Sequence, residues 1–460
     1  MAVDEQDWKK RLWANFQADF KKAIFKKSVI SVFVLVTLWN LSVATDLTTG
    51  WLDGDGPIRE TAREIRDLNL HIQMRFYQLL TSVRAVPLKP DNIRLVYIDN
   101  TAHWMKLGGE LPTSRVFLAQ LIKEMSTPPH AASAIGIDIE MLAPMGRVEG
   151  DDTDARRAGD QQLLQEIRAA SARGVPVILA SGYYMKNGRK ILIPNVLKES
   201  DLRPNPGGGC GMPRCPGFGF VNLPSDKRQI PLEEQVWTEE NPPKRETAES
   251  FALALAMLST DVKPLRADLG LSEKQDANEE RFGSFLPEKR YTVVYALNLL
   301  EEDEEALANI TNKIVLVGGH WQDMQGHGAM VDSHLSPAGQ MSGLGLHANY
   351  IASLLQEKYA REFPLWAGIL LDLLIGLVIY LGFEYGEGRR TWIILVVAFP
   401  LPILGAYFCL ANANRYLDFL FPVELYFLHV GYSLAEPHLA ERWEKLSKRW
   451  HPAAATGQQA

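Results

Sequence analysis

The chain of 460 residues has little cysteine and no excess of basic residues. Its net charge of −7 gives no positively charged footprint for nucleic acid, so no nucleic-acid partner is expected. The sequence also has no internal repeat, no glycine-rich phosphate loop followed by Lys, and no nucleophile-elbow pattern around Ser181. These absences argue against an enzyme, and we expect no catalytic residue and no cofactor.

Long apolar stretches, in contrast, lie near both ends of the chain. Residues 28–47 contain eighteen consecutive uncharged positions, and a spanning helix needs roughly 20 apolar residues. A secretory signal peptide is the alternative, but the charged tail of residues 1–27 and the lack of a clean cleavage pattern favour an uncleaved span. Three further transmembrane helices are expected at residues 363–383, 391–414 and 417–435, of which the last is the weakest.

The distribution of Lys and Arg sets the orientation of these spans. The tail of residues 1–27 carries seven, the loop 384–390 two and the tail 436–460 four, whereas the loop between the third and fourth spans carries only Arg415. The three richer segments fall on one side, which should be the cytoplasm. Residues 48–362 then form a large domain in the periplasm of a multi-pass protein of the bacterial inner membrane.

Apolar runs alternate with amphipathic stretches within residues 48–362. Strands are expected at 93–100, 134–141, 175–184, 217–226, 290–297 and 313–319, and helices at 58–83, 112–125, 160–174, 248–259 and 343–359. Strand–helix alternation implies right-handed crossovers and a parallel sheet, and the near-continuous apolar strands fit a sheet covered on both faces. The expected fold is an α/β extracytoplasmic domain with a mainly parallel sheet, flanked by one N-terminal and about three C-terminal transmembrane helices.

Several of these stretches, taken in order, resemble the CHASE type-2 family of bacterial extracytoplasmic sensory domains. The matching stretches are "VYIDN" at 96–100, "LPTSRVFLAQLI" at 111–122, "AIGIDIEM" at 134–141, "GFVNLPSD" at 219–226, "SFALALA" at 250–256, "KIVLVGG" at 313–319 and "GLHANYIASLL" at 345–355. The family layout is also similar: one span, the sensory domain, and a cluster of about three spans. The resemblance implies a sensor that feeds a cytoplasmic kinase or cyclase, but no fused kinase or cyclase motif follows residue 435.

Acidic side chains stand at the ends of two predicted strands. In open α/β sheets ligands bind beyond the carboxyl ends of the strands, where Asp99 and Asp138 should lie side by side. They are candidates for gripping a cation or a polar ligand, with Glu140 a weaker candidate on the same face. The alternative is that each acid caps a loop or the next helix.

A histidine-rich stretch, "GGHWQDMQGHGAMVDSH" at 318–334, follows the strand at 313–319 and should leave it at the same edge. Its glycines favour a loop. His320 and Asp323 are therefore candidate ligand-binding residues. His and carboxylate groups also suit zinc, so a metal site is a weaker hypothesis. Its ligands would be His320, His327, His334 and Asp332.

Two further groups of residues carry predictions. Cys210 and Cys215 lie in the predicted periplasmic domain, where an oxidising compartment favours a disulfide, with two free thiols as the alternative. Ionisable groups inside membrane spans are costly and often functional. The intramembrane candidates are Asp372, Glu424 and His429, unless the last two only face water near the membrane boundary.

The leading interpretation is a membrane sensor that binds an unidentified extracytoplasmic ligand and signals through a separate effector protein. Its partners would be the lipid bilayer, the ligand and that effector, and self-association into a homo-oligomer stays open. One alternative is a membrane structural or assembly component that binds proteins. Another is a periplasmic metal-dependent enzyme.

Overall fold

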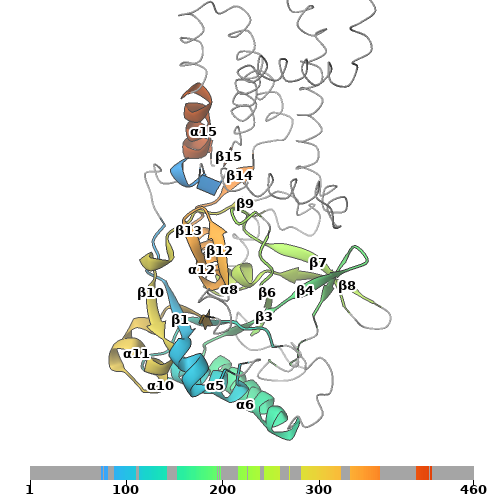
Figure 1. Cartoon of the computed structure of the whole chain (residues 1–460), viewed down its shortest axis with the longest axis vertical. Helices are drawn as coiled ribbons and strands as arrows, with labels where there is room; N and C mark the ends of the chain where they lie inside the picture. Colours follow the sequence, from blue (N-terminus) through green and yellow to red (C-terminus); the bar gives the residue numbers. More distant parts are fainter. Residues whose placement is uncertain are drawn as a thin grey trace, which may run out of the picture. The chain divides into compact units, whose positions relative to one another are not determined.

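The computed structural model describes most of residues 88–362 and short segments on either side (Figure 1). The described residues are 74–75, 77–80, 88–109, 113–141, 153–193, 195, 197, 202, 216–224, 226–238, 243–259, 269, 281–322, 332–362, 400–413 and 415–416. They cover the greater part of the domain that the sequence places outside the membrane, together with a helix from the C-terminal apolar region.

A six-stranded sheet, in which every neighbouring pair of strands is parallel, forms the centre of the domain. Its strands are β1 (Ile93–Asp99), β2 (Ala134–Asp138), β3 (Val177–Ser181), β6 (Gly217–Phe220), β10 (Thr292–Tyr295) and β11 (Ile314–His320). The order across the sheet is β10-β1-β11-β2-β3-β6. The mainly parallel α/β fold predicted from the sequence is confirmed.

Helices cover both faces of this sheet (Figure 1). One face carries α5 (Arg115–Ser126), α6 (Thr153–Ala172), α10 (Ala296–Leu300) and α11 (Glu304–Ile310), and the other carries α8 (Phe251–Ser259) and α12 (Gly343–Leu355). Ser114 caps α5 by accepting a hydrogen bond from the Phe117 N–H at 3.5 Å.

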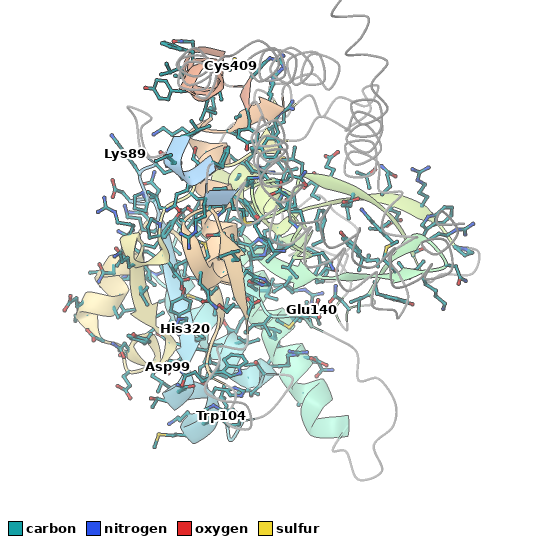
Figure 2. All side chains as sticks on the ribbon, turned by 45° about the horizontal axis from the view of Figure 1, so that its top comes forward. Lys89, Asp99, Trp104, Glu140, His320 and Cys409 are labelled. Carbon is teal, nitrogen blue, oxygen red and sulfur yellow. The ribbon has the colours of Figure 1, made fainter. Side chains whose placement is uncertain are left out.

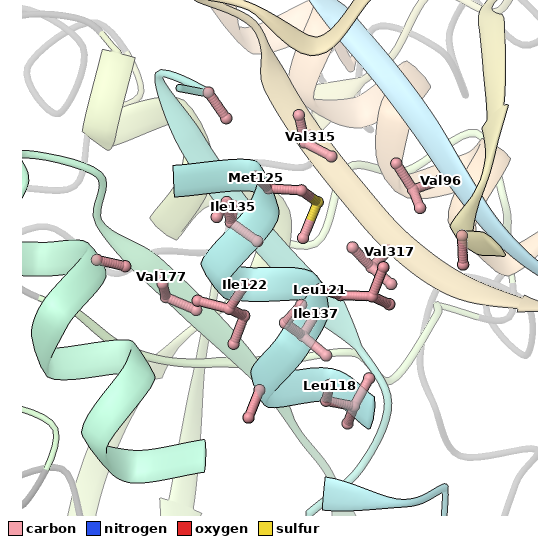
Figure 3. Close-up of a cluster of buried hydrophobic side chains, with 14 of the residues drawn as sticks. Val96, Leu118, Leu121, Ile122, Met125, Ile135, Ile137, Val177, Val315 and Val317 are labelled. Atoms are coloured by element: carbon pink, nitrogen blue, oxygen red, sulfur yellow. The ribbon is translucent and has the colours of Figure 1, made fainter. Parts of the chain in front are cut away.

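Successive side chains of each central strand enter opposite cores, because a strand alternates its faces. In β1, Val96 and Ile98 pack under α5, whereas Leu95 and Tyr97 pack under α8 and α12. Figure 3 shows the first of these cores, in which α5 packs on side chains from four central strands. Burial on both faces explains why these strands read as continuous apolar runs.

The sequence did not predict the smaller sheets. One contains β4 (Tyr183–Lys186), β5 (Arg189–Leu192), β7 (Glu233–Trp237) and β8 (Arg245–Glu249), a hairpin pairs β12 (Ser333–Ser336) with β13 (Gly339–Ser342), and a third sheet joins β9 (Arg281–Phe282), β14 (Ala360–Glu362) and β15 (Arg415–Tyr416). The strand expected at 175–184 is divided between two sheets, because the chain leaves the central sheet at Gly182 and Tyr183 begins β4. A Cβ at Gly182 would lie 2.3 Å from Glu140 Oε1, so a larger residue there would displace the Glu140 carboxylate.

The membrane spans stay predictions. Within the described part of the chain, no helix has both the length and the apolar character needed to cross a membrane. The predicted spans at 28–47, 363–383 and 417–435 lie outside that part, as do both charged tails. Of the third predicted span, residues 400–413 are described, and they form the helix α15 (Pro400–Ala413).

Candidate functional site

The carboxyl ends of β1, β11 and β2 form the edge at which the sequence places its candidate ligand residues. Asp99 is in register with His320, and Gly318 with Asp138, so β11 separates the two aspartates. The prediction that Asp99 and Asp138 lie side by side is therefore wrong, because a strand from much later in the chain inserts between β1 and β2 and separates these two strands by about 10 Å. The prediction that His320 lies at the same edge is confirmed; Figure 2 labels it together with Asp99.

Asp99 has a capping role. Its Oδ1 accepts a hydrogen bond from the Ala102 N–H at 2.9 Å, at the start of the π-helical turn η1 (Thr101–Lys106). This turn also fixes the chain after β11, because the His103 ring stacks on Trp321 with centroids 4.0 Å apart. Trp104 Nε1 donates to the Gln322 carbonyl at 3.2 Å. The Asp99 side of the edge is thus packed and hydrogen-bonded.

Glu288, which begins the 3₁₀ turn η2 (Glu288–Arg290), holds His320 and the start of α12 together. It accepts hydrogen bonds from the Tyr97 hydroxyl, from the Ser342 N–H at 2.7 Å and from Ser342 Oγ at 3.1 Å. His320 Nε2 lies 3.9 Å from Glu288 Oε1, and the His320 ring packs against Tyr97, tilted by 30°, with the ring centroids 4.2 Å apart. Burial, and then the charge of Glu288, raises the pKa of Tyr97 well above its usual range. Tyr97 therefore stays a hydrogen-bond donor.

Asp332 and His334 form a second group at the same helix terminus. Asp332 Oδ2 accepts from the Gly343 N–H at 2.9 Å, and His334 Nε2 lies 2.7 Å from Asp332 Oδ1. Burial alone would raise the pKa of Asp332, but the hydrogen bond and charge of His334 and the Gly343 N–H outweigh it and lower that pKa. Asp332 is therefore an anion at the positive end of α12, where the helix dipole favours negative charge.

Asp138 and Glu140 also lie at this edge. Neither carboxyl group accepts a hydrogen bond from a residue that the structure describes. Burial, and then the negative charges of Asp332 and Glu140, together raise the pKa of Asp138 to about 8. Burial also raises the pKa of Glu140. Near neutral pH the Asp138 carboxyl is mainly protonated, so it can donate as well as accept a hydrogen bond. Side chains whose pKa is strongly shifted cluster at functional sites.

His347 of α12 lies beneath this group and is 1% exposed. Burial lowers the pKa of His347 to about 4, although Asp332 and a hydrogen bond to the Val221 backbone act in the other direction. Among the residues that the structure describes, its Nδ1 has no hydrogen-bond partner. The ring makes an edge contact with Phe251 at 5.2 Å. His347 is thus a neutral side chain that ties α12 to α8 and to the loop after β6.

The structure leaves several predicted sites untested. Asp323 and His327, the cysteine pair Cys210 and Cys215, and the intramembrane residues Asp372, Glu424 and His429 lie outside the described residues. Within the described ranges, no three His, Cys, Asp or Glu side chains are grouped so that they could hold a metal ion. His320 and His334 contact different carboxylates, Glu288 and Asp332. The four-residue metal site and the disulfide stay predictions.

The carboxyl edge therefore contains two acids that anchor the start of α12, Glu288 and Asp332, and two with unused hydrogen-bonding capacity, Asp138 and Glu140. Glu288 was missed from the sequence because it stands in a short charged turn before the predicted strand at 290–297, whereas ligand residues were sought after the carboxyl ends of strands. No match was found among curated proteins or among solved structures. A match to the CHASE2 domain covers residues 58–382. The chain therefore belongs to the CHASE2 family of extracytoplasmic sensory domains.

Proposed function

We propose that this chain is a sensor of the bacterial inner membrane that binds a polar ligand at the carboxyl edge of its central sheet. The observation that carries the proposal is the interaction of Asp138 and Glu140, at and just after the carboxyl end of β2, with Asp332 at the start of α12, in a domain of a sensory family. Open α/β sheets bind ligands at this edge. The domain would bind its ligand without chemical conversion.

The chemistry of the edge favours a ligand with hydrogen-bond donors or a positive charge. Asp332 is anionic, and the half-buried carboxyls of Asp138 and Glu140 offer further acceptors. A donor or a cation placed among them would relieve the repulsion between neighbouring carboxyl groups and lower the pKa of Asp138. Binding would therefore release a proton near neutral pH.

We further propose that four membrane spans anchor the domain and that the signal passes to a separate effector protein. The apolar stretches and the distribution of Lys and Arg support the spans. The tail "ERWEKLSKRW" at 441–450 combines Trp with basic residues, which suits a membrane-surface or docking segment.

A thermal-shift screen of the full chain in lipid nanodiscs tests ligand binding. Polyamines, amino acids and other small cations should include compounds that raise the melting temperature, and Asp138→Asn and Asp332→Asn should each abolish the shift. Asp303→Asn is a matched control, because Asp303 caps the distant helix α11 and should leave the shift unchanged. A shift that survives both edge substitutions would refute the assigned site.

A further inference from the structure

Several distant segments of the domain meet at one buried guanidinium, that of Arg228, which is 4% exposed. Its Nη2 donates to Asp226 Oδ2 at 2.7 Å, and its Nη1 donates to the Tyr416 hydroxyl at 2.8 Å. The guanidinium carbon lies 5.4 Å from the ring centroid of Phe282 and 5.1 Å from that of Tyr416. A carboxylate, a hydroxyl and two aromatic faces thus fix its position.

Tyr77 completes this arrangement. Its ring meets Tyr416 edge-on at 4.8 Å, and its hydroxyl donates to the Gly283 carbonyl at 2.7 Å. Phe282 belongs to β9, which pairs with β14, and β14 pairs with β15, where Tyr416 lies. We refer to Tyr77, Arg228, Phe282 and Tyr416 as the junction.

The junction lies where the chain enters and leaves the predicted spans. Tyr77 follows the first predicted span along the chain, and β14 ends at Glu362, directly before the second. β15 consists of Arg415–Tyr416, between the third and the fourth. Along the chain, β14 and β15 therefore lie directly beside the predicted extracytoplasmic ends of the second, third and fourth spans.

The loop that carries Arg228 also reaches the carboxyl edge. Residues 221–224 and 226–228, here called the connector, follow β6 directly. The Asn222 side chain accepts from the Tyr183 N–H at 2.8 Å and donates to the Tyr183 carbonyl at 3.0 Å.

The connector is tied to α12 and to the acids as well. The Lys227 carbonyl accepts from the Tyr350 hydroxyl at 2.9 Å, and the Lys227 ammonium interacts electrostatically with Asp332. Asn222, near the start of the connector, thus contacts Tyr183 just after β3. Lys227, at the other end, interacts with Asp332 and lies next to Arg228, which is part of the junction.

We propose that the connector transmits a change at the carboxyl edge to the membrane spans through the contact between Arg228 and Tyr416; this rests on the proposed sensor function and on the predicted spans. A shift of Asn222 or Lys227 moves Arg228, which cannot move without breaking its bond to Tyr416. β15 is two residues long, so the loss of one anchor displaces the chain between the third and fourth spans. Tightly packed contacts of this kind switch between discrete arrangements.

Hydrogen exchange of the full chain, in nanodiscs of phosphatidylethanolamine and phosphatidylglycerol, tests the proposal without a ligand. Asn222→Ala removes both hydrogen bonds to Tyr183 and should speed exchange in peptides carrying Arg415–Tyr416 about fivefold. In a Tyr416→Phe chain, exchange there should already be fast, and Asn222→Ala should add no further change. An unchanged rate in Asn222→Ala, or an equal increment in both backgrounds, would overturn the proposal.

Asn195→Ala is the matched control, because Asn195 Nδ2 donates to Ser181 Oγ at 3.1 Å near the end of β3 but lies off the connector. It should leave exchange at Arg415–Tyr416 unchanged, and an equal increase there would also overturn the proposal. Peptides from β1 and β11 report whether each variant is folded. If Asn222→Ala unfolds, Asn222→Asp, which loses only the donated bond, replaces it. A ligand screen without a stabilising compound would count against the proposed sensor function. A failed exchange test would count only against the proposed coupling through Arg228 and Tyr416.

Discussion

Replacing Asp138 by Asn should change how the stability of the domain depends on pH. The pKa of Asp138 is raised from 3.8 to about 8 in the folded state by burial and by the charges of Asp332 and Glu140. The folded protein therefore holds a proton that the unfolded chain releases. Stability from this group is complete below pH 4 and is lost as pH rises toward 8. Asn cannot ionise, so Asp138→Asn should lack this contribution to the pH dependence.

The size of the effect follows from the same shift. One pKa unit corresponds to about 1.4 kcal/mol, and most of the change falls between the unfolded and folded pKa values. Because the side chain is only half-buried, solvent screens part of the shift. Between pH 5 and pH 7 the wild type should lose about 1 to 3 kcal/mol more unfolding free energy than Asp138→Asn.

Urea unfolding of the full chain in detergent micelles, followed by tryptophan fluorescence at pH 5, 6 and 7, measures this difference. Glu140→Gln should reduce the pH dependence in the same direction, because burial also raises the pKa of Glu140. Identical pH profiles for wild type and Asp138→Asn would refute the reasoning, since they would mean that Asp138 ionises normally in the folded protein.

Three further predictions concern packing, the start of α12 and metal. Gly219→Ala should cost more than about 3 kcal/mol of unfolding free energy and Gly136→Ala about 1 to 3, measured by urea unfolding. The new Cβ at 219 would lie 2.5 Å from the Phe251 backbone, whereas the nearest atom to a Cβ at 136 is a Leu255 methyl at 2.6 Å. Equal losses of unfolding free energy in the two variants would contradict this reasoning. Glu288→Ala leaves the Ser342 N–H and the Tyr97 hydroxyl without this acceptor and should lower the free energy of unfolding by about 1 to 3 kcal/mol. An unchanged free energy of unfolding would show that Glu288 does not anchor the start of α12. The metal hypothesis predicts stoichiometric metal in the parent chain, by elemental analysis, and none after His320, His327 and His334 are all changed to Ala.

The central strands could be predicted from the sequence because both of their faces are buried. Ile93–Asp99 and Ile314–His320 have the expected type and nearly the expected bounds, since continuous β-branched and apolar runs specify buried parallel strands. α12 was predicted from the apolar residues that recur along it. For these elements, local pattern and tertiary burial agree.

The arrangement of the edge could not be predicted because it depends on contacts between distant segments. The insertion of β11 between β1 and β2 pairs Ile314 with Ile93, 221 positions earlier, and with Ala134, 180 positions earlier, and no local pattern encodes that order. Glu288 contacts Tyr97 and Ser342, which lie 191 and 54 positions away. The β4-β5-β7-β8 sheet was missed because its short strands carry charged residues and are only partly buried.

The central claim is that the ligand binds at the carboxyl edge beside Asp138 and Asp332. The most direct test is the hydrogen-exchange footprint, on the full chain in nanodiscs, of whichever compound from the thermal-shift screen stabilises it most. We predict slower exchange in peptides carrying residues 134–141 and 332–345, and loss of that protection in Asp138→Asn. A footprint confined to the β4-β5-β7-β8 sheet, or protection that persists in Asp138→Asn, would contradict the assignment of the site.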